Sequence, residues 1–266
     1  MKPRLRSRTN KGGGGFKLIV VSRLFAATGV VAATVFAPFL TAPAASAAPC
    51  PDVELVFARG TFEPPGVGGT GQAFVDSLRP KLGDKSLDVY PVEYPASLDF
   101  QTAADGVIDA SNKVQAVAAE CPKTKIVLSG YSQGAAVTGY LTADSVPAGF
   151  QMPAGLTGPM PPAIADHVAA VALFGKPSSG FLQMIANTAP PITVGHLYTA
   201  KTVDLCIPED PICSPGGGDS NAHNMYPANG LTDQAAEFVA QKVSAAPSTP
   251  STSSPSTSAP SVQTAR

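Results

Sequence analysis

Five short apolar runs, rich in β-branched and aromatic residues, are spaced along the middle of the chain and predict β-strands. They cover residues 53–57, 87–92, 126–129, 168–174 and about 196–203. The segments between and after them have apolar residues at helical spacing and predict helices over 71–82, about 100–120, 132–143 and 231–243. Strands that alternate with helices in this way predict a parallel sheet covered by helices on both faces.

The helical periodicity also predicts which side chains face the core. In the second helix the inward face carries Val107, Ala110, Val114, Val117 and Cys121. In the last helix we expect Thr232 to cap the N-terminus, and the inward residues are Ala235, Phe238, Val239 and Val243. Residues 146–162 are rich in Gly and Pro and predict an irregular surface loop.

The two ends of the chain differ from the middle. Residues 1–47 join a basic leader, an uncharged apolar run over 24–40 and the small residues Ala45-Ser46-Ala47, which together predict a secretory signal peptide. The alternative is an uncleaved membrane anchor, although the run is near the lower length limit for a membrane span. Residues 244–266 are rich in Ser, Thr, Pro and Ala and predict a disordered tail. One folded domain is therefore expected over 48–243.

Removal of the leader changes the charge of the chain. The full sequence has 18 basic and 19 acidic residues, but seven of the basic residues precede residue 48. The exported part then carries 11 basic against 19 acidic residues, a net charge of −8. This balance argues against nucleic acid or an anionic lipid surface as an electrostatically held partner.

The chain has four cysteines, all within the exported part: Cys50, Cys121, Cys206 and Cys213. An even number in an exported protein suggests two disulfides. Three pairings are possible, and we choose Cys50–Cys121 and Cys206–Cys213. A zinc site is the alternative, but the spacings lack the C-x-x-C pair that such sites commonly use.

The third strand is followed by Gly130-Tyr131-Ser132-Gln133-Gly134 and then by a helix. A strand, the pattern G-x-S-x-G and a helix form the layout of a nucleophile elbow, which exposes a serine hydroxyl above the sheet. The pattern therefore predicts Ser132 as a nucleophile at the carboxyl end of a strand, where parallel sheets bind their ligands. A simple Gly/Ser turn between two elements is the alternative.

A serine nucleophile needs a histidine base and an acid that orients it. Of His167, His196 and His223, only His223 lies in a polar loop just before the last helix, so we expect it to be the base. The acids that precede it are Asp204, Glu209, Asp210 and Asp219. Asp210 lies within the expected Cys206–Cys213 loop, but spacing alone does not decide among these acids.

Several segments together resemble the cutinase family. They are Gly130–Gly134, the run Cys206-Ile-Pro-Glu-Asp-Pro-Ile-Cys213 with His223 thirteen residues after Asp210, and Val56-Phe-Ala-Arg-Gly-Thr61 after the first strand. Glu63-Pro-Pro-Gly66 is similar to the mycobacterial cutinase-like branch. The resemblance covers residues 50–243. It implies a lid-less α/β-hydrolase, a three-layer sandwich around a five-stranded parallel sheet, with the triad Ser132, Asp210 and His223 and the two disulfides chosen above.

The resemblance also places an oxyanion hole at the backbone N–H of Gln133 and at Thr61. It implies a secreted carboxylic ester hydrolase, a serine esterase for short- to medium-chain acyl groups that uses no metal or cofactor. We expect the substrate to be an apolar ester or lipid, and candidates for the groove that binds it are Phe181, Leu182, Ile185, Ile192 and Leu197.

Two other functions stay open at the level of the sequence. The first is a phospholipase or thioesterase acting on envelope lipids, and the second is a cell-surface binding protein whose catalysis is vestigial. We expect the protein to be secreted and to act as a monomer. Association with the cell wall is a further hypothesis.

Overall fold

The computed structural model describes residues 49–146, 154 and 158–245 and contains one five-stranded parallel sheet. The strands are β1 (Val53–Ala58), β2 (Leu87–Pro91), β3 (Lys125–Tyr131), β4 (Val168–Phe174) and β5 (Thr202–Leu205). Their spatial order is β2-β1-β3-β4-β5. The predicted α/β fold with a central five-stranded parallel sheet is thus confirmed.

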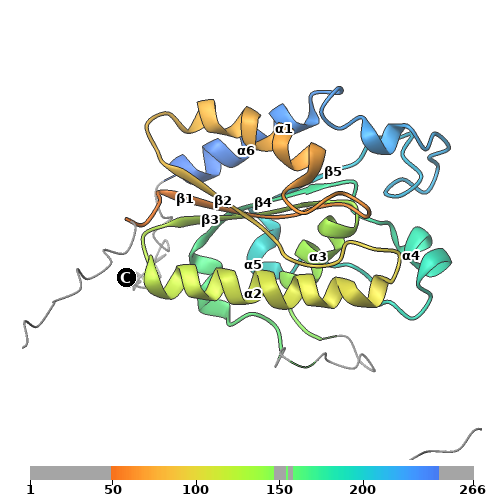
Figure 1. Ribbon diagram of the computed structural model, residues 1–266, viewed down its shortest axis with the longest axis horizontal. Helices are drawn as coiled ribbons and strands as arrows, with labels where there is room; N and C mark the ends of the chain where they lie inside the picture. Colours follow the sequence, from red (N-terminus) through yellow and green to blue (C-terminus); the bar gives the residue numbers. More distant parts are fainter. Residues whose placement is uncertain (1–48, 147–153, 155–157, 246–266) are drawn as a thin grey trace, which may run out of the picture. The chain divides into compact units, whose positions relative to one another are not determined.

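Helices cover both faces of the sheet, as parallel strands require. Figure 1 shows α1 (Gly68–Leu78) and α6 (Leu231–Ser244) on one face and α2 (Ala103–Glu120) and α3 (Gln133–Leu141) on the other. Two shorter helices, α4 (Ser179–Ile185) and α5 (His196–Thr199), follow β4. Single 3₁₀ turns lie at Arg79–Leu82, Phe100–Thr102, Pro162–Asp166 and Ala222–Asn224.

Each face of the sheet packs against its own hydrophobic cluster. Strand residues alternate between the faces, so Leu55 and Phe57 contact the cluster beneath α1 and α6, and Val56 and Leu128 contact the cluster beneath α2 and α3. Because the strands are parallel, their carboxyl ends meet at one edge. Segments that follow different strands are therefore brought together there.

The structure corrects two local predictions. Residues 196–199 form helix α5 rather than the start of a strand, and β5 begins only at Thr202. The Asp144 carboxylate accepts a hydrogen bond from the His196 N–H and thereby caps this short helix from a distant segment. The N-cap of α6 is Gly230 in a left-handed conformation, and Thr232 is buried instead.

Other differences concern the bounds of helices. The predicted helix over 71–82 is an α-helix followed by a 3₁₀ turn, and α4 was not predicted from the sequence. Ser178 is the N-cap of α4, and its hydroxyl accepts a hydrogen bond from the Phe181 N–H. The predicted inward faces of α2 and α6 are buried or partly buried.

Both chosen disulfides are present. Cys50–Cys121 joins the segment before β1 to the end of α2, and Cys206–Cys213 closes a short loop after β5. All four cysteines are therefore paired, and none remains as a thiolate ligand for zinc.

Parts of the sequence analysis lie outside the described residues. These are the predicted signal peptide over 1–47, nearly all of the predicted tail over 244–266, and much of the predicted surface loop over 146–162. Within the described residues, no helix combines the length and the apolarity needed to cross a membrane.

Candidate active site

Ser132 lies in the sharp turn between β3 and α3. Its backbone angles are φ 55° and ψ −117°, a region that residues other than glycine rarely adopt. The turn is possible because its neighbours have no Cβ atoms. A Cβ at Gly130 would collide with the carbonyl of Gly134, and one at Gly134 would collide with the carbonyl of Ala58. The predicted elbow is therefore explained by close approach of backbone segments.

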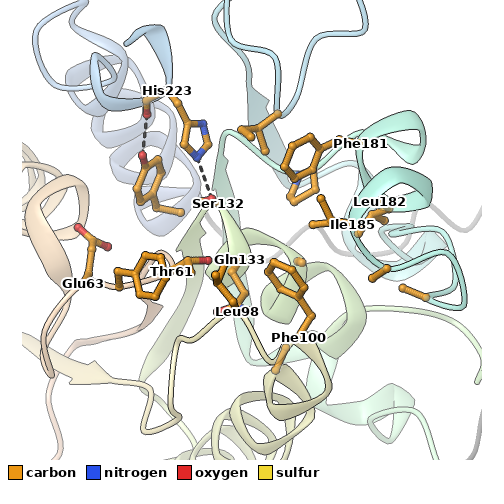
Figure 2. A pocket seen from close by; sticks show the side chains of 18 of the residues that line it. Thr61, Glu63, Leu98, Phe100, Ser132, Gln133, Phe181, Leu182, Ile185 and His223 are labelled. Carbon is orange, nitrogen blue, oxygen red and sulfur yellow. Dashed lines mark hydrogen bonds between the residues drawn. The ribbon is translucent and has the colours of Figure 1, made fainter. Parts of the chain in front are cut away.

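Three residues from distant parts of the chain form a line of hydrogen bonds at this turn. His223 Nε2 lies 2.8 Å from Ser132 Oγ, and His223 Nδ1 lies 2.7 Å from Asp210 Oδ2. Figure 2 shows the imidazole pointing at the serine from the loop before α6. An imidazole held between a hydroxyl and a carboxylate can accept the hydroxyl proton and carry the resulting charge.

Asp210 is fully buried and its carboxylate is surrounded by donors. Besides the imidazole, Oδ2 accepts a hydrogen bond of 2.7 Å from the Tyr226 hydroxyl, and Oδ1 accepts one of 2.8 Å from the Ile212 N–H. Burial and the hydrogen bond to Asp210 raise the pKa of Tyr226, so its hydroxyl stays protonated and donates. These donors compensate the desolvation of the carboxylate and fix its orientation.

Two tyrosines hold the imidazole of His223. The ring of Tyr131 stacks on it with centroids 4.9 Å apart, and the Tyr131 hydroxyl donates to the His223 carbonyl at 2.7 Å. The ring of Tyr226 meets the imidazole edge to face. The sequence analysis gave neither tyrosine a role, although Tyr131 lies inside the G-x-S-x-G motif and Tyr226 is three residues after His223.

The other candidate histidines and acids lie elsewhere. His167 precedes β4, and His196 lies on α5, where its ring pairs with Asp144. Asp204 of β5 pairs with Lys176, which follows β4, and Asp219 accepts a hydrogen bond from the N–H of Asn221 in its own loop. Among the candidate acids, Asp210 is the one whose carboxylate contacts His223.

Thr61 and Gln133 line the same pocket as Ser132. Gln133 is the first residue of α3, and backbone N–H groups in the first turn of a helix have no acceptor within the helix. Figure 2 shows Thr61 on the neighbouring loop, beside the serine. Such donors can stabilise negative charge that develops near a serine hydroxyl.

The loop that carries Thr61 is held by several hydrogen bonds. The Glu63 carboxylate accepts hydrogen bonds from the N–H groups of Gly60 at 2.6 Å and Gly69 at 2.7 Å. The buried guanidinium of Arg59 donates to the carbonyls of Glu63 and Tyr94. The backbone on both sides of Thr61 is thus fixed in place.

A pocket of about 370 Å³ opens over Ser132 and is lined mainly by apolar side chains. In Figure 2, Phe181, Leu182 and Ile185 of α4 form one side, and Leu98 and Phe100 form another. Its size and lining are typical of sites for small apolar ligands.

The five residues expected to line the groove have different positions. Phe181, Leu182 and Ile185 line the pocket. Ile192 is buried in a small cluster with Ala136 and Leu182, and Leu197 lies half-exposed on α5. The sequence analysis missed the pocket residues of other segments, which carry no motif; among them are Phe62, Leu98, Phe100, Ala136 and Tyr140.

Comparison with known proteins identifies the family to which this chain belongs. The family model described as cutinase matches residues 49–243. The chain is 49% identical over 220 residues to Carboxylesterase Culp1 of Mycobacterium tuberculosis, which covers 81% of this chain and 94% of that protein. It is 46% identical over 223 residues to Phospholipase Culp4 of the same organism, with 84% of this chain and 92% of that protein covered.

Solved structures show the same fold. A Trichoderma reesei cutinase in complex with a phosphonate inhibitor aligns with a TM-score of 0.55 and 34% identity, covering 74% of this chain and 78% of that one. The catalytic core of acetyl xylan esterase from Trichoderma reesei aligns with a TM-score of 0.58 and 23% identity, covering 73% of this chain and all of that one. The latter likeness concerns the fold alone.

Proposed function

Because the chain belongs to the cutinase family and is a carboxylic ester hydrolase, we propose that it is a secreted serine esterase for short- to medium-chain acyl esters. The observation that carries this proposal is the unbroken line from Ser132 Oγ through the imidazole of His223 to the buried carboxylate of Asp210. It supplies a nucleophile, a base and an orienting acid in hydrogen-bonding contact.

In the proposed reaction Ser132 Oγ attacks the ester carbonyl while His223 Nε2 takes the hydroxyl proton. The N–H of Gln133 and the backbone or hydroxyl of Thr61 stabilise the oxyanion. His223 then gives its proton to the departing alcohol, leaving an acyl-serine. The same imidazole then deprotonates a water molecule, whose oxygen attacks the acyl carbonyl. The bond from that carbon to Ser132 Oγ breaks, the imidazolium returns its proton to Oγ, and the acid leaves. Asp210 keeps Nδ1 protonated throughout and stabilises the imidazolium.

A second candidate function is hydrolysis of phospholipids. It is favoured by the 46% identity to Phospholipase Culp4 and by the apolar lining of the pocket above Ser132. The same three residues would act on the acyl ester bond of a lipid. Release of fatty acid from phosphatidylcholine vesicles, compared with turnover of a soluble ester, separates the two functions.

The proposal of secretion rests on the leader predicted from the sequence and on the two disulfides, which persist in oxidising compartments. Monomeric action and envelope association remain proposals. Gel filtration of the purified protein and fractionation of expressing cells test them.

The decisive experiment compares the purified protein with its Ser132→Ala variant on p-nitrophenyl butyrate. We expect kcat to fall by at least about 10⁴-fold, because the nucleophile is lost while binding is retained. Ser220→Ala, which changes an exposed serine in the loop before His223, is the matched control and should retain turnover. A reactive alkyl phosphonate should add one phosphonyl group, located at Ser132 by peptide mass.

Retained turnover in a folded Ser132→Ala protein would contradict the assignment of the nucleophile. Absence of turnover on every ester, in a folded protein with both disulfides formed, would favour a binding protein on an esterase fold.

A further inference from the structure

The pocket extends away from Ser132 along helix α3. Ser132, Ala136 and Tyr140 all line it; Ser132 is the N-cap residue just before α3, and Ala136 and Tyr140, four residues apart, lie on one face of the helix. Eight residues of helix advance by about 12 Å. The pocket therefore has a floor about 12 Å long that begins at the serine hydroxyl and ends at a tyrosine.

Tyr140 closes the far end of this floor. It is the last residue of α3, among the described residues, that lines the pocket. Its ring packs against the cluster formed by Ala136, Leu182 and Ile192, and its hydroxyl donates to the carbonyl of Pro190 at 2.5 Å. Burial raises the pKa of Tyr140 to about 12, so the hydroxyl stays protonated and the contact persists. The ring is thus tied to the segment after α4.

Beyond Gln133, the side chains beside this floor are small in the middle and mainly apolar. Ala136 and Ala103 contribute only methyl groups, and the α4 side contributes Leu182 and Ile185. A flexible hydrocarbon chain fits such a lining because it has no polar group to desolvate. Each methylene that it buries contributes about 0.8 kcal/mol, or roughly fourfold in kcat/KM.

The position of His223 decides which half of an ester lies on this floor. The leaving oxygen must receive its proton from His223 Nε2. Ala222 and Tyr226, on either side of His223, pack in the cluster beneath α6, whereas Ala136 and Tyr140 pack in a separate cluster with Leu182 and Ile192. The alcohol therefore leaves on the α6 side of the sheet edge, and the acyl chain that stays on Ser132 lies along α3.

We propose that Tyr140 determines which acyl chain lengths this enzyme accepts, because its ring closes the pocket at the end of the floor that begins at Ser132. The inference rests on the proposed esterase function. An extended hydrocarbon chain advances about 1.3 Å per carbon, given a C–C bond of about 1.5 Å in a zigzag. A floor of about 12 Å thus holds an acyl chain of roughly eight to ten carbons.

The test measures kcat/KM for p-nitrophenyl esters with acyl chains of two to sixteen carbons. In the natural protein kcat/KM should rise with chain length up to about eight to ten carbons and then level off or fall. In Tyr140→Ala the rise should continue for at least two more carbons. The kcat/KM for the twelve-carbon ester, divided by that for the eight-carbon ester, should then increase by at least about tenfold relative to the natural protein. Tyr140→Phe keeps the ring and should keep the maximum where it is.

A second variant tests the same pocket in the opposite direction. Ala136 lies about 6 Å along α3 from Ser132, so Ala136→Leu should move the maximum down to about four or five carbons. Tyr90→Ala removes a half-buried tyrosine of β2 that does not line the pocket, and it should leave the shape of the profile unchanged. Circular dichroism confirms that each variant is folded.

The result that overturns the inference is a chain-length profile that Tyr140→Ala and Ala136→Leu both leave unchanged in a serine-dependent enzyme. A series of butyrate esters with alcohols of increasing length tests the orientation. If Tyr140→Ala alters the preference for the alcohol and not for the acyl chain, the assignment of the floor to the acyl group is wrong. Loss of the proposed function itself would be recognised separately, as the absence of Ser132-dependent turnover at every chain length.

Discussion

At the scale of single residues, the orientation of the Asp210 carboxylate depends on Tyr226, a neighbour for which no contact with Ser132 is observed. The Tyr226 hydroxyl donates to Oδ2, the same oxygen that binds His223 Nδ1. Tyr226 is fully buried and its ring also packs against the imidazole. It is therefore a positioning residue, because it orients the acid that in turn orients the base.

Tyr226→Phe keeps the ring and removes this donor. We expect kcat on p-nitrophenyl butyrate to fall about 10-fold with little change in KM, because a hydrogen bond to a charged group contributes about 1.5–3 kcal/mol and only part of it is specific to the transition state. The measurement is steady-state kinetics on both proteins.

A matched control is available in the same chain. The Tyr90 hydroxyl donates to Asp109 at 2.9 Å, and neither residue lines the pocket, so Tyr90→Phe also removes a tyrosine–aspartate hydrogen bond. If both variants lose the same fraction of kcat, the effect of Tyr226→Phe is a general loss of stability and not a loss of positioning.

At the scale of elements, the two disulfides constrain different parts of the molecule. Cys206–Cys213 closes the loop that carries Asp210, and the sulfur of Cys213 lies 3.4 Å from Asp210 Oδ2. Cys50–Cys121 ties the segment before β1 to the end of α2 and spans 71 residues, against seven for the other bridge. The chain-entropy model then gives the longer bridge about 4.4 kcal/mol and the shorter one about 2.5 kcal/mol.

When each pair is replaced by serines, the variant that loses more stability should therefore be the one that loses less activity. We expect Cys50→Ser/Cys121→Ser to lower the free energy of unfolding more, because it opens the longer loop. We expect Cys206→Ser/Cys213→Ser to lower kcat more at 25 °C, because it releases the backbone around Asp210. Urea unfolding and steady-state kinetics measure the two quantities. Equal losses of kcat in two folded variants would show that the shorter bridge does not position Asp210.

At the scale of the whole molecule, stability should depend on pH through a buried acid between β1 and α2. Glu54 is 2% exposed, and Lys113 of α2 lies 2.8 Å from its Oε1. Burial raises the pKa of Glu54, and the lysine partly opposes this shift. The folded protein therefore disfavours the ionised carboxylate, and the stability that Glu54 contributes falls as pH rises from its ordinary pKa through its raised one.

Lys113→Met removes the opposing charge, so the raised pKa of Glu54 should rise further. We expect the free energy of unfolding to fall by about 3 kcal/mol at pH 8. At that pH the folded protein must either bury an unpaired carboxylate or protonate Glu54, and both cost free energy. The loss should be smaller at pH 5, because protonation there costs less. Urea unfolding at the two pH values measures the difference.

The double variant Glu54→Gln/Lys113→Met provides the control, since it leaves no buried charge. It should recover most of the loss at pH 8. A loss in the single variant that is equal at pH 5 and pH 8 would mean that lost packing of the lysine stem, and not the charge of Glu54, is responsible.

The sequence by itself determined the class of the fold, because the periodicity of apolar residues and the spacing of glycines specify local structure over a few residues. The strand bounds at 168–174, the elbow at Ser132 and the inward faces of α2 and α6 were predicted on that basis. The start of α5 was not predicted, since Asp144, 52 residues away, caps it.

Only the tertiary structure decided which acid meets His223 and where the pocket ends. Ser132 and His223 are 91 residues apart, and they meet because parallel strands bring their carboxyl ends to one edge of the sheet. Spacing alone did not choose among four acids, and no motif marks Tyr226 or Tyr140. Their contacts depend on which segments the sheet and its helices bring together, a long-range property that local sequence pattern does not encode.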